Sequence, residues 1–164
     1  MEESRRSSLR SCALRFIKAL RASISRGLVL RVVKEVRVRF MGREAVATAL
    51  FDTGSGYTVI KKGFFERAFG PSWSPLPRPV KLYLVNGETV VADKYAAVTI
   101  VIDDYELLPP ETVLVLDEFV DEIVVEGRKI KLPDVIIGAG TMDKYGITLD
   151  PREGVKILKA GLLL

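Results

Sequence analysis

A carboxyl group in a loop rich in glycine and hydroxyl side chains is the feature of this 164-residue sequence best suited to chemistry. The loop follows an apolar stretch that ends at Phe51, and it consists of Asp52, Thr53, Gly54, Ser55 and Gly56. A carboxyl group placed where a buried strand opens into such a loop is partly desolvated, and backbone N–H groups and hydroxyls can fix its orientation. Asp52 is therefore the candidate catalytic residue.

The residues around Asp52 have the properties that a supporting loop needs. Gly54 lets the backbone approach closely, and the Thr53 hydroxyl can hydrogen-bond back into the scaffold. Ser55 can hold the outer carboxylate oxygen of Asp52. The same residue types also suit an ordinary turn, because Asp and Ser cap local backbone groups and glycine adopts positive φ. On the loop alone, both interpretations stay open.

Two further features follow the loop along the chain. The dipeptide Asn86-Gly87 lies between two apolar runs and is a strong β-hairpin signal. Farther on, Ile136 and Ile137 precede Gly138, and residues 141–145 are predicted to form a helix. Without the aspartate motif, this second feature would indicate only the end of a buried strand.

Together these features resemble the retropepsin-like, retroviral-type family of single-domain aspartic peptidases. Members carry Asp-Thr/Ser-Gly at a strand-to-loop junction and, farther on, two apolar residues and a glycine that lead into a helix. The resemblance covers roughly residues 31–158. It implies that Asp52 is catalytic, that Thr53 braces its counterpart in a second subunit, and that Gly138 packs beneath the catalytic loop.

The same resemblance assigns the predicted hairpin to the flap that covers a bound substrate. Tyr83 and Leu84 could reach over a substrate, although either could equally belong to the core. The candidate flap and substrate-binding residues are Tyr83, Leu84, Asn86 and Gly87.

Hydrolysis of a peptide bond by water needs one carboxylate as base and one carboxylic acid to protonate the carbonyl oxygen. The sequence has one such motif, and Asp134, Asp143 and Asp150 lack the glycine and hydroxyl loop. A two-fold homodimer would bring together two copies of Asp52. We therefore expect a homodimeric aspartic endopeptidase that acts on polypeptides with no cofactor and no metal.

Two alternatives to a peptidase stay open. The first is a catalytically silent member of the same fold that acts as a binding or scaffold module. The second makes Asp52 a phosphoryl-accepting nucleophile at a strand end. This second alternative is weakened because the residues after Thr53 do not match the motifs of that enzyme class.

Short strands must position Asp52, because β-type patterns outnumber helical ones. A strand from Leu28 turns at Met41-Gly42 and returns over residues 44–51. A helix is predicted at 62–69 and a proline-rich loop at 71–79. Further strands are predicted at 80–85, 88–95, 97–102, 112–116, 123–125, 128–132, 135–137 and 155–158. The fold class is therefore mainly β, and the resemblance implies a closed six-stranded acid-protease barrel with one or two short helices.

The termini suggest further contacts. Residues 4–26 have the pattern of a basic amphipathic helix, which divides the chain into an extension at 1–27 and a peptidase domain at 28–164. This helix could dock on the domain, contact an anionic membrane surface or act as a targeting segment. Residues 155–158 and 162–164 would leave an apolar strand edge exposed in a monomer. The resemblance implies that such terminal strands interleave between the subunits of a dimer.

The amino-acid composition excludes several kinds of active site and binding partner. The absence of histidine excludes Ser/His/Asp and Cys/His nucleophiles and the common zinc sites, and the lone Cys12 excludes an internal disulfide. We therefore expect a cytoplasmic protein without a signal peptide or membrane span. The net charge of +4 is concentrated before Gly27, so the domain offers no footprint for nucleic acid. Scarce amides among many Lys, Arg and Glu indicate a thermophilic source.

Overall fold

The computed structural model describes residues 30–83, 89–117, 122–125, 128–131 and 133–158. These residues are mainly β, and they form twelve strands and two helices. The elements are β1 (Arg31–Phe40), β2 (Arg43–Asp52), β3 (Val59–Lys61), α2 (Lys62–Phe69), β4 (Ser74–Tyr83), β5 (Thr89–Ile102), β6 (Tyr105–Glu106), β7 (Glu111–Leu116), β8 (Glu122–Val125), β9 (Arg128–Lys131), β10 (Val135–Gly138), α3 (Ala139–Tyr145), β11 (Ile147–Asp150) and β12 (Gly154–Ile157). The predicted N-terminal helix lies outside the described residues.

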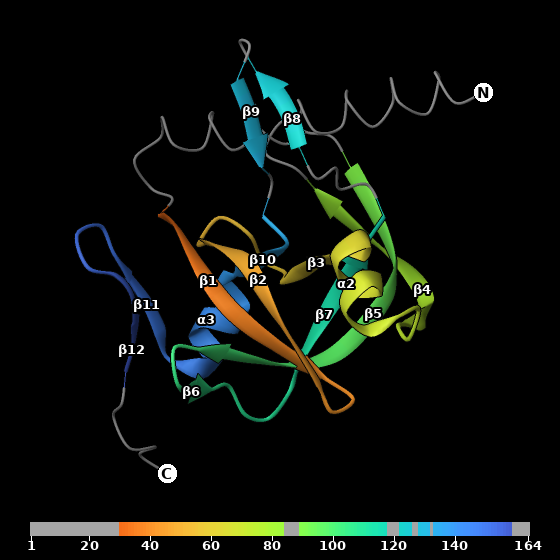
Figure 1. Ribbon diagram of the computed structural model, residues 1–164, viewed down its shortest axis with the longest axis horizontal. Helices are drawn as coiled ribbons and strands as arrows, with labels where there is room; N and C mark the ends of the chain where they lie inside the picture. Colours follow the sequence, from red (N-terminus) through yellow and green to blue (C-terminus); the bar gives the residue numbers. More distant parts are fainter. Residues whose placement is uncertain (1–29, 84–88, 118–121, 126–127, 132, 159–164) are drawn as a thin grey trace.

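Six of the strands pair in a closed circuit (Figure 1). β1 pairs with β2, β2 with β10, β10 with β3, β3 with β7, β7 with β5, and β5 pairs again with β1. The β2–β10 and β3–β7 pairings are parallel, and the other four are antiparallel. β4 extends the sheet from β5 outside this circuit, and β6 pairs with the end of β5. The circuit leaves its six strands without a common open edge.

The main core lies on one face of these strands. Alternate residues along each strand point to the same face, so Val36 and Val38 of β1 face Ala47, Ala49 and Phe51 of β2 inside the core. Both helices add to it. α2 supplies three phenylalanines, two of which contact the ring of Phe40, and α3 supplies a methionine; these side chains are Phe64, Phe65, Phe69 and Met142.

A second apolar cluster lies on the opposite face of the same strands. In β2, Leu50 belongs to this cluster while its neighbours Ala49 and Phe51 belong to the main core. The buried members are Leu50, Val59, Ala92, Leu114, Leu116 and Ile136, and we call them the outer apolar cluster. Partly buried side chains of β4 and β5 pack against it, namely Leu76, Val80, Leu82, Val90 and Tyr95.

Three sequence expectations need correction. The proline-rich segment predicted as a loop is partly strand, because β4 begins at Ser74; its ladder with β5 is interrupted between Pro75 and Val80, and an edge position tolerates proline. The strands predicted at 88–95 and 97–102 are one continuous strand, β5. No strand was predicted at 147–150, but β11 lies there and pairs with β12, whose Val155 and Ile157 pack against the main core.

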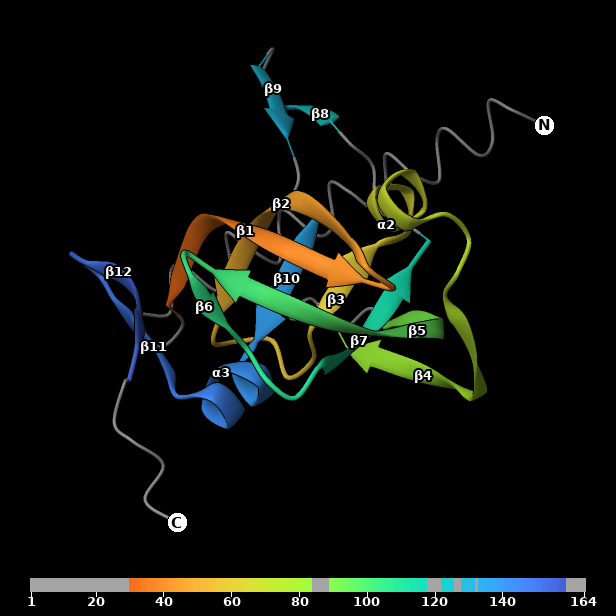
Figure 2. The same ribbon diagram turned by 60° about the horizontal axis from the view of Figure 1, so that its bottom comes forward.

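The turned view in Figure 2 shows the β11–β12 hairpin on the outside of the molecule, next to β1 and away from α2. Gly154 at the start of β12 lies close to Val32 of β1. Among the described residues, no helix has both the length and the apolar character needed to cross a membrane.

Candidate active site

Asp52 and Gly138 lie side by side where two parallel strands end. Asp52 is the last residue of β2, Gly138 is the last residue of β10, and the ladder between the strands pairs these two residues. The chain enters the predicted loop after Asp52 and helix α3 after Gly138. The parallel register therefore brings together the two motifs that the sequence places far apart.

Asp52 is buried, with 6% of the residue exposed, and each oxygen of its carboxylate has a hydrogen-bond donor. The N–H of Gly54 donates to Oδ1 at 2.9 Å. Nε of Arg31 donates to Oδ2 at 3.0 Å, and Arg31 is the residue opposite Asp52 in the β1–β2 ladder. Such charge-assisted hydrogen bonds are stronger than neutral ones. The carboxylate is thus both desolvated and firmly oriented.

Gly138 lies directly against the loop. A Cβ at this position would be 2.5 Å from the carbonyl oxygen of Tyr57 and 2.7 Å from that of Ser55. The next residue, Ala139, donates its N–H to the same Ser55 oxygen at 2.7 Å. No side chain fits at 138 without a shift of the backbone that supports Asp52.

Two buried threonines, which the sequence analysis did not single out, also hold the loop. The Thr58 hydroxyl accepts the N–H of Gly138 at 3.1 Å and lies 2.5 Å from the Thr141 hydroxyl of α3. These bonds connect the far side of the loop to β10 and α3. Nothing in the sequence pattern marks them, because threonines next to apolar runs are common in strands.

Thr53 and Ser55 bond to main-chain groups. The Thr53 hydroxyl accepts the N–H of Leu30 at 2.9 Å, and the Thr53 N–H donates to the Leu30 carbonyl at 3.1 Å. The Ser55 hydroxyl donates to the Tyr57 carbonyl at 2.8 Å. Ser55 was expected to hold one oxygen of the Asp52 carboxylate, but those oxygens accept hydrogen bonds from Gly54 and Arg31. The Ser55 hydroxyl instead holds the loop through Tyr57.

Arg31 is the site residue that sequence reasoning missed. Its signal was present, because the two-residue turn at Met41-Gly42 fixes the register of the hairpin. Counting back along both strands from that turn places Arg31 opposite Asp52.

The other candidate residues lie apart from this loop or outside the described residues. Tyr83 is the last residue of β4 and is 77% exposed, so it is not part of the core. Leu84, Asn86 and Gly87 fall outside the described residues.

The three additional aspartates are not set in a second catalytic loop. Asp134 is buried and accepts the Thr48 N–H at 2.9 Å, with Nζ of Lys61 at 3.9 Å. Asp150 accepts two N–H groups of the β11–β12 turn, which lowers the pKa of its carboxyl. Asp143 lies exposed on α3. In the described part of the chain, no group of three or more acidic or cysteine side chains is arranged to hold a metal ion.

Comparison with known proteins gives similarity at the level of structure. No protein-family model matches the chain, and no curated protein matches it. The chain is similar to the solved structure of the retroviral protease-like domain of Ddi1 from Leishmania major. The identity is 12% and the TM-score 0.45, over 78% of this chain and 90% of that chain.

Proposed function

We propose that the chain is an aspartic endopeptidase in which two copies bring their Asp52 carboxyls together. One observation carries the proposal. The Asp52 carboxyl is buried and oriented at the end of β2, while Thr53, Gly54 and Gly56 of the same loop are exposed. A second copy can therefore reach the loop without unfolding the subunit.

The chemistry follows from two carboxyls in contact. Two like charges at contact distance repel, so one carboxyl keeps a proton and the other is ionised. The carboxylate removes a proton from water, and the water oxygen bonds to the peptide carbonyl carbon. The carboxylic acid gives its proton to the carbonyl oxygen. As the C–N bond of the tetrahedral intermediate breaks, the protonated carboxyl gives its proton to the amine. One hydroxyl of the intermediate returns its proton to the carboxylate, and the C=O bond re-forms.

The outer apolar cluster favours a peptide as the substrate. Leu50 is two residues before Asp52 on the same face of β2, and Ile136 is its partner on β10. If the β4–β5 hairpin that covers this face lifted, a peptide beneath it would place its apolar side chains against the cluster and its backbone near Asp52. The β4–β5 hairpin already packs on the cluster, which suits the role of a flap. The closed circuit of six strands suits an acid-protease barrel.

One observation favours a second candidate, the catalytically silent binding or scaffold module. The Arg31 guanidinium at 3.0 Å compensates the charge of the Asp52 carboxylate. A carboxylate with a permanent counter-ion of this kind has no need to share a proton with a second carboxyl. If the ion pair persists in the dimer, the fold and the dimer remain but the general acid is absent.

The test compares cleavage of a denatured protein substrate by the wild type, Asp52→Asn and Asp104→Asn over a range of acidic to neutral pH. Asp104 is a fully exposed aspartate remote from the loop, so its variant controls for loss of a carboxylate in general. We expect cleavage by the wild type and Asp104→Asn and none by Asp52→Asn. Equal cleavage by all three proteins would refute the proposal.

An equimolar mixture of wild type and Asp52→Asn tests whether the site is shared. If each active site needs two Asp52 residues, random pairing places about half of the wild-type subunits in inactive heterodimers. Activity per wild-type subunit should fall by that fraction at concentrations where the protein is dimeric. Unchanged activity would show that one subunit is sufficient.

A further inference from the structure

We propose that the start of β1 is an autoinhibitory latch, in which Leu30 and Arg31 occupy the Thr53 and Asp52 groups that a second subunit would otherwise engage. The inference rests on the proposed function, because it concerns how that dimeric site becomes active. The latch consists of two contacts, which we call its arms: Arg31 with the Asp52 carboxylate, and the Leu30 main chain with Thr53.

The first arm is the ion pair between Arg31 and Asp52. The side chains are 12% and 9% exposed, and Nε lies 3.0 Å from Oδ2. If two latched subunits met, each carboxylate would keep a cation of its own. The repulsion that makes two carboxyls share one proton would then be compensated, and the pair would lack the acid that protonates the substrate. Arg31 must therefore leave Oδ2 before catalysis.

The second arm is the pair of hydrogen bonds between Leu30 and Thr53. By the resemblance, the Thr53 hydroxyl is the group through which the two loops of a dimer would brace each other, and the Thr53 N–H lies beside it on the exposed loop. Both are bonded to the Leu30 main chain of the same subunit, at 2.9 and 3.1 Å. Because a hydrogen-bonded group gains little when it only exchanges partners, the internal bonds weaken the net stabilisation of a dimer.

The latch lies where β1 is least tied down. β1 pairs with β2 along its whole length, but its ladder with β5 includes only Arg37, Val38 and Arg39. The first residues of β1 therefore have one strand partner, and Leu30 just before them is 40% exposed. Strand ends with few neighbours open at a lower free energy than strand centres. The start of β1 can detach while its far end stays in the sheet.

The decisive variant is Arg31→Met, which removes the cation but keeps a long apolar side chain. Arg37→Met is the matched control, because Arg37 is on the same face of the same strand and makes no contact with Asp52. Dimer dissociation constants are measured by sedimentation equilibrium on the full chain. We expect Arg31→Met to dimerise about tenfold more tightly than the wild type, and Arg37→Met to match the wild type.

These outcomes separate the latch from the peptidase. Tighter dimers of Arg31→Met without any cleavage would support the latch and refute the peptidase. Cleavage by the wild type together with equal or weaker dimerisation of Arg31→Met would refute the latch alone. A chain that stays monomeric in both proteins would refute both.

A second measurement follows the intact wild type. The Arg31 Nε–H signal is observed by NMR while the protein concentration is raised through the dimerisation range, and it is assigned by its loss in Arg31→Lys. We expect slow hydrogen exchange of this N–H in the monomer and faster exchange in the dimer. An N–H that stays equally protected in the dimer would refute the latch and support the silent module.

Discussion

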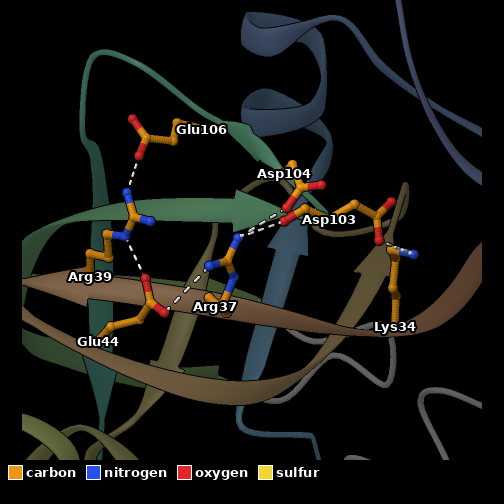
Figure 3. Close-up of polar contacts among 7 residues, drawn as sticks. All are labelled: Lys34, Arg37, Arg39, Glu44, Asp103, Asp104 and Glu106. Carbon is orange, nitrogen blue, oxygen red and sulfur yellow. Dashed lines mark hydrogen bonds and ion pairs between the residues drawn. The ribbon is translucent and has the colours of Figure 1, made fainter.

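The two ends of β1 carry the same residue type on the same face, yet their ion pairs differ in character. At the start, Arg31 pairs with Asp52, and both side chains are largely buried. At the far end, Arg37 and Arg39 share Glu44 of β2 in an exposed network. Figure 3 shows both guanidinium groups directed at Glu44, with Asp103, Asp104 and Glu106 on their other side and Lys34 on Asp103.

The two ends of β1 differ in how far water reaches their ion pairs, since the chemical groups are alike. Exposed ion pairs are screened by water and salt, and many contribute little to stability. A desolvated pair loses far more when one partner is removed, because the other charge is left without compensation. Burial therefore distinguishes Arg31 from the more exposed Arg37 and Arg39 of the same strand.

The largest effect is expected at Gly138, beside the Asp52 end of β1, and Gly42 at the turn end of β1 serves as its comparison. Gly138→Ala would force the new Cβ against two backbone carbonyls of the loop, so we expect a loss of about 3 kcal/mol in unfolding free energy. Gly42→Ala at the β1–β2 turn has open space around its Cβ but a φ of +76°, so about 1 kcal/mol is expected. Urea denaturation measures both. A Gly138→Ala variant as stable as Gly42→Ala would contradict the close packing at the site.

The next effect comes from the buried arginine. Arg31→Met leaves the Asp52 carboxylate without its cation, and we expect the monomer to lose about 2–3 kcal/mol of unfolding free energy, below the value for a fully buried pair. Thermal and urea unfolding are measured at concentrations where the chain is monomeric. Arg37→Met serves as the control and should unfold close to the wild type. Equal losses in the two variants would remove the distinction between the ends of β1.

Salt should separate the two ends further. The Debye length falls to about 3 Å at 1 M salt, so any difference in Tm between the wild type and Arg37→Met should disappear there. The difference caused by Arg31→Met should persist, because water and ions have little access to that pair. The measurement is a series of thermal melts at increasing sodium chloride. A difference for Arg31→Met that vanishes equally fast would indicate an exposed pair.

The smallest effect is expected for Glu44, in the way that Tm depends on pH. The hydrogen bond from Arg39 lowers the pKa of Glu44 below its usual value of 4.5. A carboxylate whose pKa is lower in the folded than in the unfolded state stabilises the protein at pH values above the unfolded-state pKa. This contribution is lost as the pH falls through the folded-state pKa. The difference in Tm between the wild type and Glu44→Gln should therefore be present at neutral pH and close in strong acid. A difference that is constant with pH would contradict this linkage.

The elements that frame the site could be predicted from the sequence, because each has a local signal. The apolar run before Asp52 indicates the end of β2, the apolar run before Gly138 indicates the end of β10, and the helix predicted at 62–69 coincides with α2. Hydrophobic period and glycine position are sufficient for these elements.

The partners of Asp52 and Thr53 follow from the register that the Met41-Gly42 turn sets, and residue types alone do not reveal them. Arg31 looks like any charged residue on the solvent face of a strand until the β1–β2 ladder places it opposite Asp52. The strand character of residues 74–79 was also missed, since proline indicates a loop unless the strand is known to be an edge. Contacts between distant segments, such as Thr58 with Thr141, leave no local pattern.

Leu30 contributes only its main-chain N–H and carbonyl to Thr53, and this makes one arm of the latch independent of side-chain identity. Most substitutions at this position would preserve both bonds, and proline would remove only the N–H. A cut in the chain just after residue 30 would remove both at once and leave Arg31 at a new terminus. Most substitutions at position 30 would thus preserve this arm, whereas cleavage of the chain by a protease would break both hydrogen bonds in a single irreversible step.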